Sequence, residues 1–260
     1  MAETVSMYRA DSPAVRHIGL ERPWAWLAAG WRDLAAYPMI SLSYGLVFAL
    51  CGLLLLFLTS QLRMWYVALP LAAGFMLLGP VLAVGLYDVS RRRESGEPVT
   101  FALTAIAWRR NPSQLGLMAL MLMLFFLVWI RLATLIFALF YGYHTPPLDT
   151  LVQEVFFSTN SLAFLFVGNL TGAILAALVF AISAVSIPML LDRNVNAVAA
   201  IGTSLRAVQE NPGPMAVWAA LIVLFTAAGM VVFFLGLIVA LPLIGHATWH
   251  CYRDLVGSPD

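Results

Sequence analysis

Three stretches of the chain end in proline and share one spacing of apolar residues: LAAGWRDLAAYP at Leu27–Pro38, FALTAIAWRRNP at Phe101–Pro112 and IGTSLRAVQENP at Ile201–Pro212. Counted back from each proline, an apolar residue stands at the fourth, seventh and eleventh positions. These offsets fall on one face of an α-helix. Since a long apolar run follows each proline, the pattern predicts a unit that occurs three times. Each unit consists of an amphipathic helix, a proline break and a helical hairpin.

The composition is typical of a protein embedded in a membrane. The 260 residues are 62% hydrophobic and 10% charged, whereas soluble domains are roughly 45–50% apolar and about 25% charged. The formal net charge is +1, and the densest basic run is Arg91–Arg93, which we interpret as a topology signal. Such a chain lacks the basic surface that a phosphate backbone requires, so no nucleic-acid partner is expected.

The apolar runs predict an all-α fold with six transmembrane helices in three hairpins. Four of them are long enough for about 30 Å of hydrocarbon and are expected near Met39–Gln61, Trp65–Ser90, Gln114–Tyr141 and Ser161–Leu191. The last two must fit between Met215 and Trp249, with a turn around Gly229. Two alternatives remain there: the second helix extends past Cys251, or the hairpin is re-entrant.

This pattern also predicts the domain organisation. Residues 1–23 form an N-terminal tail, residues 24–254 a single six-helix membrane domain, and residues 255–260 a C-terminal tail. The repeat units within the domain are 24–94, 98–193 and 195–254. The N-terminal tail is polar and lacks the apolar segment of a signal peptide, so the first span is expected to direct membrane insertion.

The arginines predict the orientation. All of them except Arg63 and Arg131 fall on one side of the six predicted spans, and the positive-inside rule places that side, with both termini, in the cytoplasm. The three pre-proline helices lie on the same side, and we expect them to lie flat in the headgroup region, where Trp24, Trp31 and Trp108 fit well. The alternative is that they are the cytoplasmic ends of tilted spans.

The longest outer segment, residues 142–160, is expected to hold a short helix on the outer surface. Asp149 and Glu154 are its acidic residues, and Arg131 near the outer end of the third span can pair with either. A charge at the centre of a span would suggest a substrate or ion contact. Arg131 lies near the interface instead, so we expect its side chain to extend towards the headgroups.

The fourth span contains GNLTG at Gly168–Gly172. Glycines four residues apart let two helix backbones approach closely, and Asn169 can hydrogen-bond across such a contact. We expect Gly168, Asn169 and Gly172 to serve helix packing within the chain. The alternatives are the seam of a homo-oligomer and the polar lining of a small pathway.

The stretch richest in chemistry is GHATWHCYRD at Gly245–Asp254. His246, His250 and Asp254 recur every four residues and therefore share one helix face. Two imidazoles and a carboxylate could bind Zn²⁺ or copper, with Cys251 or His17 as a further ligand. The alternative that we favour is a belt of aromatic and polar residues, in which His250 and Asp254 bond to neighbouring helix ends.

Several segments resemble a bacterial inner-membrane family defined by a domain of unknown function, DUF2189. They are Gly79–Tyr87, Pro188–Arg193, Asn211–Met215 and Gly245–Asp254, and the resemblance covers nearly the whole chain. Members of that family are sometimes labelled as cytochrome c oxidase subunits. A catalytic oxidase subunit needs twelve spans and a set of deep histidines, so the resemblance implies at most an accessory or assembly role beside respiratory complexes.

These observations favour a non-enzymatic protein that is a structural or accessory partner of other membrane proteins. The sequence contains no P-loop, no dinucleotide-binding glycine motif, no HExxH and no pair of catalytic carboxylates, and no cofactor is expected. The expected partners are the lipid bilayer, other membrane-protein subunits and, as one option, further copies of the chain. The competing hypothesis is a small transporter or metal-handling protein that uses the His246 and His250 region or the Asn169 region.

Overall fold

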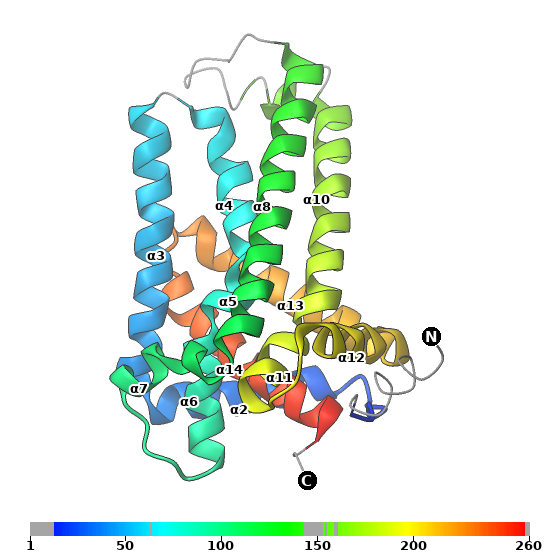
Figure 1. The fold of residues 1–260 in the computed structure, drawn as a ribbon. Coiled ribbons are helices and arrows are strands. Elements are labelled where there is room, and N and C mark those ends of the chain that lie inside the picture. The colour runs from blue at the N-terminus through cyan, green and yellow to red at the C-terminus, as the bar shows by residue number, and fades with distance from the viewer. Residues whose placement is uncertain (1–12, 63, 143–152, 154, 159–160, 258–260) are drawn as a thin grey trace. The chain divides into compact units, whose positions relative to one another are not determined.

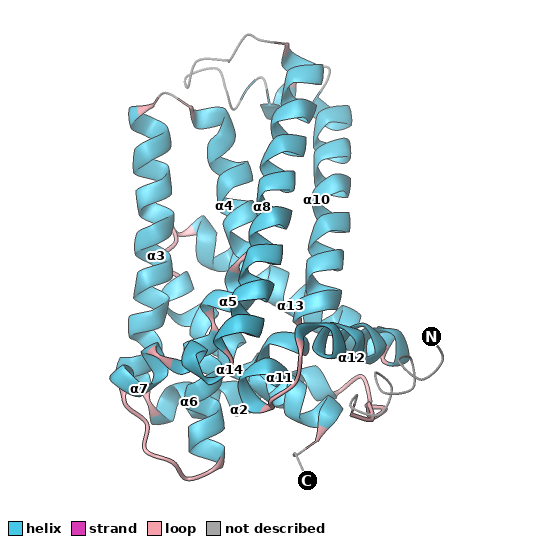
Figure 2. Ribbon diagram, in the orientation of Figure 1, coloured by secondary structure: helices cyan, strands magenta, loops and turns pink. Residues whose placement is uncertain are grey.

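The computed structural model describes residues 13–62, 64–142, 153, 155–158 and 161–257, and all regular elements in these ranges are helices (Figures 1 and 2). The predicted all-α fold is therefore confirmed for the described part of the chain. The elements are α2 (Arg22–Ala36), α3 (Pro38–Gln61), η1 (Trp65–Val67), α4 (Ala68–Leu77), α5 (Gly79–Leu82), α6 (Val84–Glu94), α7 (Phe101–Ala105), η2 (Ala107–Arg110), α8 (Pro112–Tyr141), α10 (Ser161–Ser183), α11 (Ser186–Asp192), α12 (Ala197–Glu210), α13 (Pro212–Val231) and α14 (Leu237–Val256).

The three prolines that end the repeated stretches are each the first residue of a long helix. Pro38 begins α3, Pro112 begins α8 and Pro212 begins α13. Proline lacks an N–H group and has a fixed φ, so it fits the first turn of a helix and interrupts the helix before it. The predicted breaks are thus confirmed, and a helical segment precedes each one, although the second is split into α7 and η2.

Four helices are long and apolar enough to cross a membrane. They are Pro38–Gln61, Pro112–Tyr141, Ser161–Asp192 and Pro212–Val231. They match the first, third, fourth and fifth predicted spans, so the membrane-embedded character is confirmed, whereas six spanning helices are not.

The second and sixth predicted spans are not among these four helices, for identifiable reasons. The second, Trp65–Ser90, is divided into η1, α4, α5 and the first part of α6, and the Gly79-Pro80 pair lies between its two longer pieces. In the sixth, α14, only Leu237–Ile244 is continuously apolar before the polar stretch that begins at Gly245. A count of apolar residues along the chain does not detect a broken helix, whereas the polar residues from Gly245 onward lower the mean hydropathy of α14.

The chain forms two compact units. Unit 1 consists of Met1–Leu50, Pro80–Ala119 and Phe180–Asp260, and unit 2 of Cys51–Gly79 and Leu120–Val179. The core of unit 1 is built on α14, which packs against α2, α6 and α13. Glycines allow two of these approaches, because a Cβ atom at Gly30 would lie 2.7 Å from the Ala247 nitrogen and one at Gly245 would lie 2.8 Å from Leu86.

Unit 2 is held by aromatic and small residues. Phe137 stacks on Tyr66 and on Tyr141 with ring centroids 5.0 Å apart in both pairs, and Phe164 meets it edge-on at 6.1 Å. The Trp129 indole nitrogen donates to the Pro70 carbonyl at 2.7 Å. These contacts link η1 and α4 to the later part of α8 and to α10.

The apolar stripe shared by the three pre-proline helices is only partly buried within unit 1. Trp31, Phe101 and Trp108 are each about half exposed, whereas Leu34 is buried. The buried face of α2 shares only Leu34 with this stripe and otherwise carries Trp26, Gly30 and Asp33. The repeated stripe therefore lies largely on the surface of the unit.

Most of the predicted outer segment, residues 142–160, including Asp149 and Glu154, lies outside the described residues.

Candidate functional site

The imidazole of His246 lies at the centre of a buried polar cluster in unit 1. Its Nε2 is 2.9 Å from Ser41 Oγ on α3, and its Nδ1 is 2.8 Å from Ser90 Oγ on α6. Ser90 donates its own proton to Asp33 Oδ2 at 2.5 Å. Ser90 must therefore accept from Nδ1–H, and Ser41 donates to Nε2, which assigns a neutral imidazole protonated at Nδ1.

Asp33 on α2 joins the same cluster to the surface. Its carboxylate accepts hydrogen bonds from Ser90 and from His250 Nε2, the latter at 2.8 Å, and forms an ion pair with Arg93. Burial alone would raise the pKa of Asp33, but the hydrogen bonds from His250 and Ser90 and the charge of His250 outweigh it and lower this pKa to about 2. The carboxylate is 3% exposed and connects α2, α6 and α14.

The third residue of the predicted histidine face, Asp254, has partners of its own on α2. Arg22 donates to both carboxylate oxygens at 2.6 and 2.8 Å, and the Trp26 indole nitrogen donates at 2.8 Å. The spacing of four residues thus places His246, His250 and Asp254 on a face of α14 that meets α2, with His246 also reaching α3 and α6.

Further bonds attach the end of α14 to α6 and α11. Glu94 accepts from Trp249 Nε1 at 2.9 Å and from Arg253 at 2.8 Å. Tyr252 donates its hydroxyl to Asp192 at 2.7 Å and accepts from Arg193 at 2.9 Å. Below, the α14 network means the polar side chains that form these bonds, together with those that form the bonds of His246, Asp33 and Asp254.

Sequence reasoning missed several members of the α14 network, above all Asp33, Ser90, Ser41 and Arg93. Asp33 lies beside Leu34 in an amphipathic helix, and its partner His250 is 217 positions away. The available signal was a carboxylate on the helix that precedes an apolar hairpin.

The run Arg91–Arg93 does more than the topology signal that the sequence suggests. These arginines also form ion pairs with Asp88, Glu97 and Asp33.

The geometry of Ser41, His246 and Ser90 resembles that of a hydroxyl activated by a base, with the imidazole between two hydroxyls at hydrogen-bond distance. Ser41 and His246 are fully buried and Ser90 is 1% exposed. A substrate therefore cannot reach Ser41 Oγ without a movement of the surrounding helices. In the observed conformation the cluster binds helices to one another.

The proposed metal ligands are engaged separately. His246 contacts two serines, His250 contacts Asp33, and Asp254 contacts Arg22 and Trp26. Within the described residues, no three histidine, cysteine or acidic side chains are grouped so that they could hold a metal ion. The arrangement supports hydrogen bonding between helices, and metal analysis remains the test of the ligand hypothesis.

The predicted packing residues of α10 lie in unit 2. A Cβ atom at Gly172 would lie 3.1 Å from the Trp129 ring, whereas one at Gly168 would meet nothing within 4 Å. Asn169 is exposed and donates to the Leu165 carbonyl of its own helix at 2.7 Å. Gly172 is therefore the member of this set that makes a close contact within its unit.

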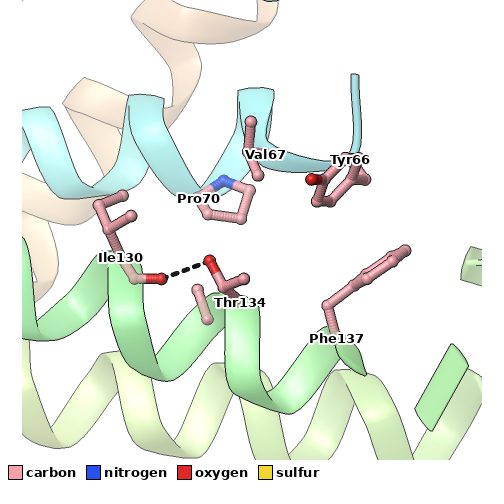
Figure 3. Close-up of a pocket in the computed structure, with 7 residues that line it drawn as sticks. Tyr66, Val67, Pro70, Ile130, Thr134 and Phe137 are labelled. Atoms are coloured by element: carbon pink, nitrogen blue, oxygen red, sulfur yellow. Dashed lines mark hydrogen bonds between the residues drawn. The ribbon is translucent and has the colours of Figure 1, made fainter. Parts of the chain in front are cut away.

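Unit 2 also has a small apolar pocket between η1–α4 and α8 (Figure 3). Its Thr134 hydroxyl donates to the Ile130 carbonyl at 2.7 Å, so this polar group is already engaged. The pocket is lined by Tyr66, Val67, Pro70, Ile130, Ala133, Thr134 and Phe137.

Comparison with known proteins agrees with an embedded chain. The model of a family described as "Predicted integral membrane protein (DUF2189)" matches residues 68–192, which include Gly79–Tyr87 and most of Pro188–Arg193. Asn211–Met215 and Gly245–Asp254 lie beyond the match, which is shorter than the resemblance suggested. No curated protein and no solved structure matches the chain significantly. Residues 68–192 are thus similar to a family of predicted integral membrane proteins, DUF2189.

Proposed function

We propose that this protein is a non-enzymatic, multi-pass protein of the bacterial inner membrane that acts as a structural or accessory partner of other membrane proteins, respiratory complexes among them. The observation that carries the proposal is the α14 network. Its histidines and carboxylates, the groups that chemistry or metal binding would need, are bonded to α2, α3, α6 and α11 inside unit 1. A network whose centre, at His246 and Asp33, is buried and hydrogen-bonded specifies one arrangement of helices.

The distribution of charge supports a cytoplasmic position for the arginine-bearing segments of unit 1 and for both termini. Every described arginine of the set predicted to be cytoplasmic lies in unit 1, whereas Arg131 lies in unit 2. In this proposal the chain enters the membrane three times from the cytoplasmic side, as the three predicted helical hairpins.

The surface of the pre-proline helices supports contact with headgroups. Trp24, Trp31 and Trp108 are 59%, 53% and 50% exposed. Each of the last two is followed by an exposed arginine, Arg32 or Arg109. Tryptophan beside arginine is suited to the boundary between acyl chains and water, where the ring and the cation both find partners.

Purification of the full chain in a mild detergent tests the proposal. We expect a defined membrane-protein partner at constant stoichiometry in two detergents, and metal content at background by elemental analysis. The alternative, a transporter or metal-handling protein, requires about one metal per chain that is lost in the His246→Ala, His250→Ala double variant. Gln209→Ala is the control, since this exposed side chain belongs neither to the histidine face nor to its candidate further ligands. A metal that follows this pattern would overturn the proposal.

A further inference from the structure

The hairpin of α13 and α14 ends in a turn without polar side chains. Residues 232–236 read VFFLG, and Val231, Val232 and Phe233 are 81%, 56% and 72% exposed. Turns that face water are rich in glycine, proline, asparagine, aspartate and serine, because these residues suit the backbone and bond to solvent. This turn presents large apolar side chains to its surroundings instead.

The backbone of the turn is largely bonded within the hairpin. Phe234 donates to the Met230 carbonyl, Leu235 to Val232 and Leu237 to Phe234, at 2.9–3.2 Å. Phe233 and Phe234 have φ angles of +47° and +64°, which reverse the chain sharply. Satisfied backbone groups are the condition for placing a turn in hydrocarbon.

Two glycines close the hairpin. A Cβ atom at Gly236 would lie 2.7 Å from the Gly229 Cα, so a side chain at this position would push the two helices apart. The predicted turn around Gly229 is therefore close to the observed one, and the reversal is compact.

The inclination of α14 follows from its two contacts with α3. His246 meets Ser41, and eight residues earlier Ile238 meets Gly45, where a Cβ atom would overlap the Ile238 carbonyl. Eight helical residues extend about 12 Å, yet the matching stretch of α3 extends only about 6 Å. α14 is therefore steeply inclined to α3.

The depth of the turn is set by the same contact. Gly45 lies seven residues after Pro38, about 10 Å along α3, whereas the hydrocarbon core is about 30 Å thick. Residues 232–236 lie about one helical turn beyond Ile238, so they reach no deeper than about the middle of the hydrocarbon core. The length of α13 along its own axis does not change this, because an inclined helix crosses less of the membrane.

We infer that α13 and α14 form a re-entrant hairpin, which enters and leaves the membrane on the cytoplasmic side and places residues 232–236 among the acyl chains of the cytoplasmic leaflet. The chain then crosses the membrane four times, and the third hairpin lies within the cytoplasmic leaflet. The inference rests on the membrane orientation of the proposed function. It does not depend on a protein partner. A failure to co-purify a partner would therefore count against the proposed function alone, and an unexpected topology would count against the re-entrant hairpin alone.

Single cysteines in a Cys51→Ala, Cys251→Ala background test the topology in cells. Phe233→Cys and Val232→Cys mark the turn, Met64→Cys marks the outer end of α3, and Ser95→Cys marks the cytoplasmic end of α6. We expect a membrane-impermeant maleimide to label Met64→Cys from outside and Ser95→Cys only in inverted vesicles. It should label neither turn variant from either side, although both should react in denaturant.

A nitroxide on the same turn cysteines measures depth. We expect collisions with oxygen to exceed those with a water-soluble nickel complex, as they do for a site within hydrocarbon. Labelling of either turn variant from outside, at the extent of Met64→Cys, would show that the hairpin spans and overturn the inference. Labelling in inverted vesicles at the extent of Ser95→Cys would place the turn in water and overturn it equally.

Discussion

Unit 1 joins its helices through buried charged and hydrogen-bonded side chains, whereas the described residues of unit 2 meet through aromatic rings, small residues and one indole bond. Asp33 is 3% exposed and carries bonds to two other helices. In unit 2, Phe137 and Phe164 contact each other and two tyrosines, and Trp129 lies over Gly172.

The difference matters because the two kinds of contact tolerate change differently. A buried carboxylate requires every partner in place, since a lost partner leaves a charge or donor uncompensated. Packed aromatic and aliphatic groups can shift to recover part of a lost contact. Unit 1 is therefore expected to be sensitive at single polar positions, and unit 2 to respond to changes of volume.

The largest effect is expected from Asp33→Ala. It leaves Arg93, His250 and Ser90 without their common buried acceptor, and the loss of this acceptor lowers the free energy of unfolding by about 3 kcal/mol. The measurement is reversible unfolding in mild detergent. Glu21→Ala, at the exposed start of α2, is the control and should change this free energy by less than about 0.5 kcal/mol. An Asp33→Ala variant as stable as the control would show that apolar packing holds unit 1.

The second effect compares two glycines. Gly45→Ala must displace the backbone of α14 at Ile238, and such overpacking lowers the free energy of unfolding by about 1–3 kcal/mol. Gly168→Ala meets nothing within 4 Å and should be neutral or stabilising by up to about 1 kcal/mol, because alanine favours a helix more than glycine does. Equal losses in both variants would contradict the close approach of α3 and α14.

The third effect is the response to acid. The lowered pKa of Asp33, about 2 against a usual 3.8, means that its contribution is present above pH 4 and lost as the pH falls towards 2. The loss is on the order of 2 kcal/mol. The described part of unit 2 contains no carboxylate, so hydrogen exchange should accelerate in unit 1 alone between pH 4 and 2. An equal slope in the Asp33→Asn variant would assign the acid response to other groups.

The proline breaks and the apolar helices could be predicted because their signals are local. Pro38, Pro112 and Pro212 act on their own turns of the chain. The number of crossings could not be read from the sequence in the same way, because hydropathy measures the length of an apolar run, whereas a crossing depends on the inclination of the helix. The close approach of Ile238 to Gly45, which reports this inclination, arises only from tertiary packing.

The candidate site was predicted in part. Helical spacing placed His246, His250 and Asp254 on one face, and each of them is bonded to a neighbouring helix. Their partners were not predictable, because Asp33 belongs to a face of α2 that the repeated apolar stripe does not mark. Only folding brings that face to α14.

The smallest effect tests the indole bond in unit 2. Trp129→Phe keeps an aromatic ring over Gly172 but removes the donor to the Pro70 carbonyl, so the free energy of unfolding should fall by about 1 kcal/mol, the usual net value of one hydrogen bond. Trp31→Phe, at a half-exposed position of α2, is the control and should change this free energy by less than about 0.5 kcal/mol. Hydrogen exchange should accelerate in α4 rather than in α14. A loss as large as that of Asp33→Ala would show that a single polar contact governs unit 2 as well, and the contrast between the units would then lie in composition alone.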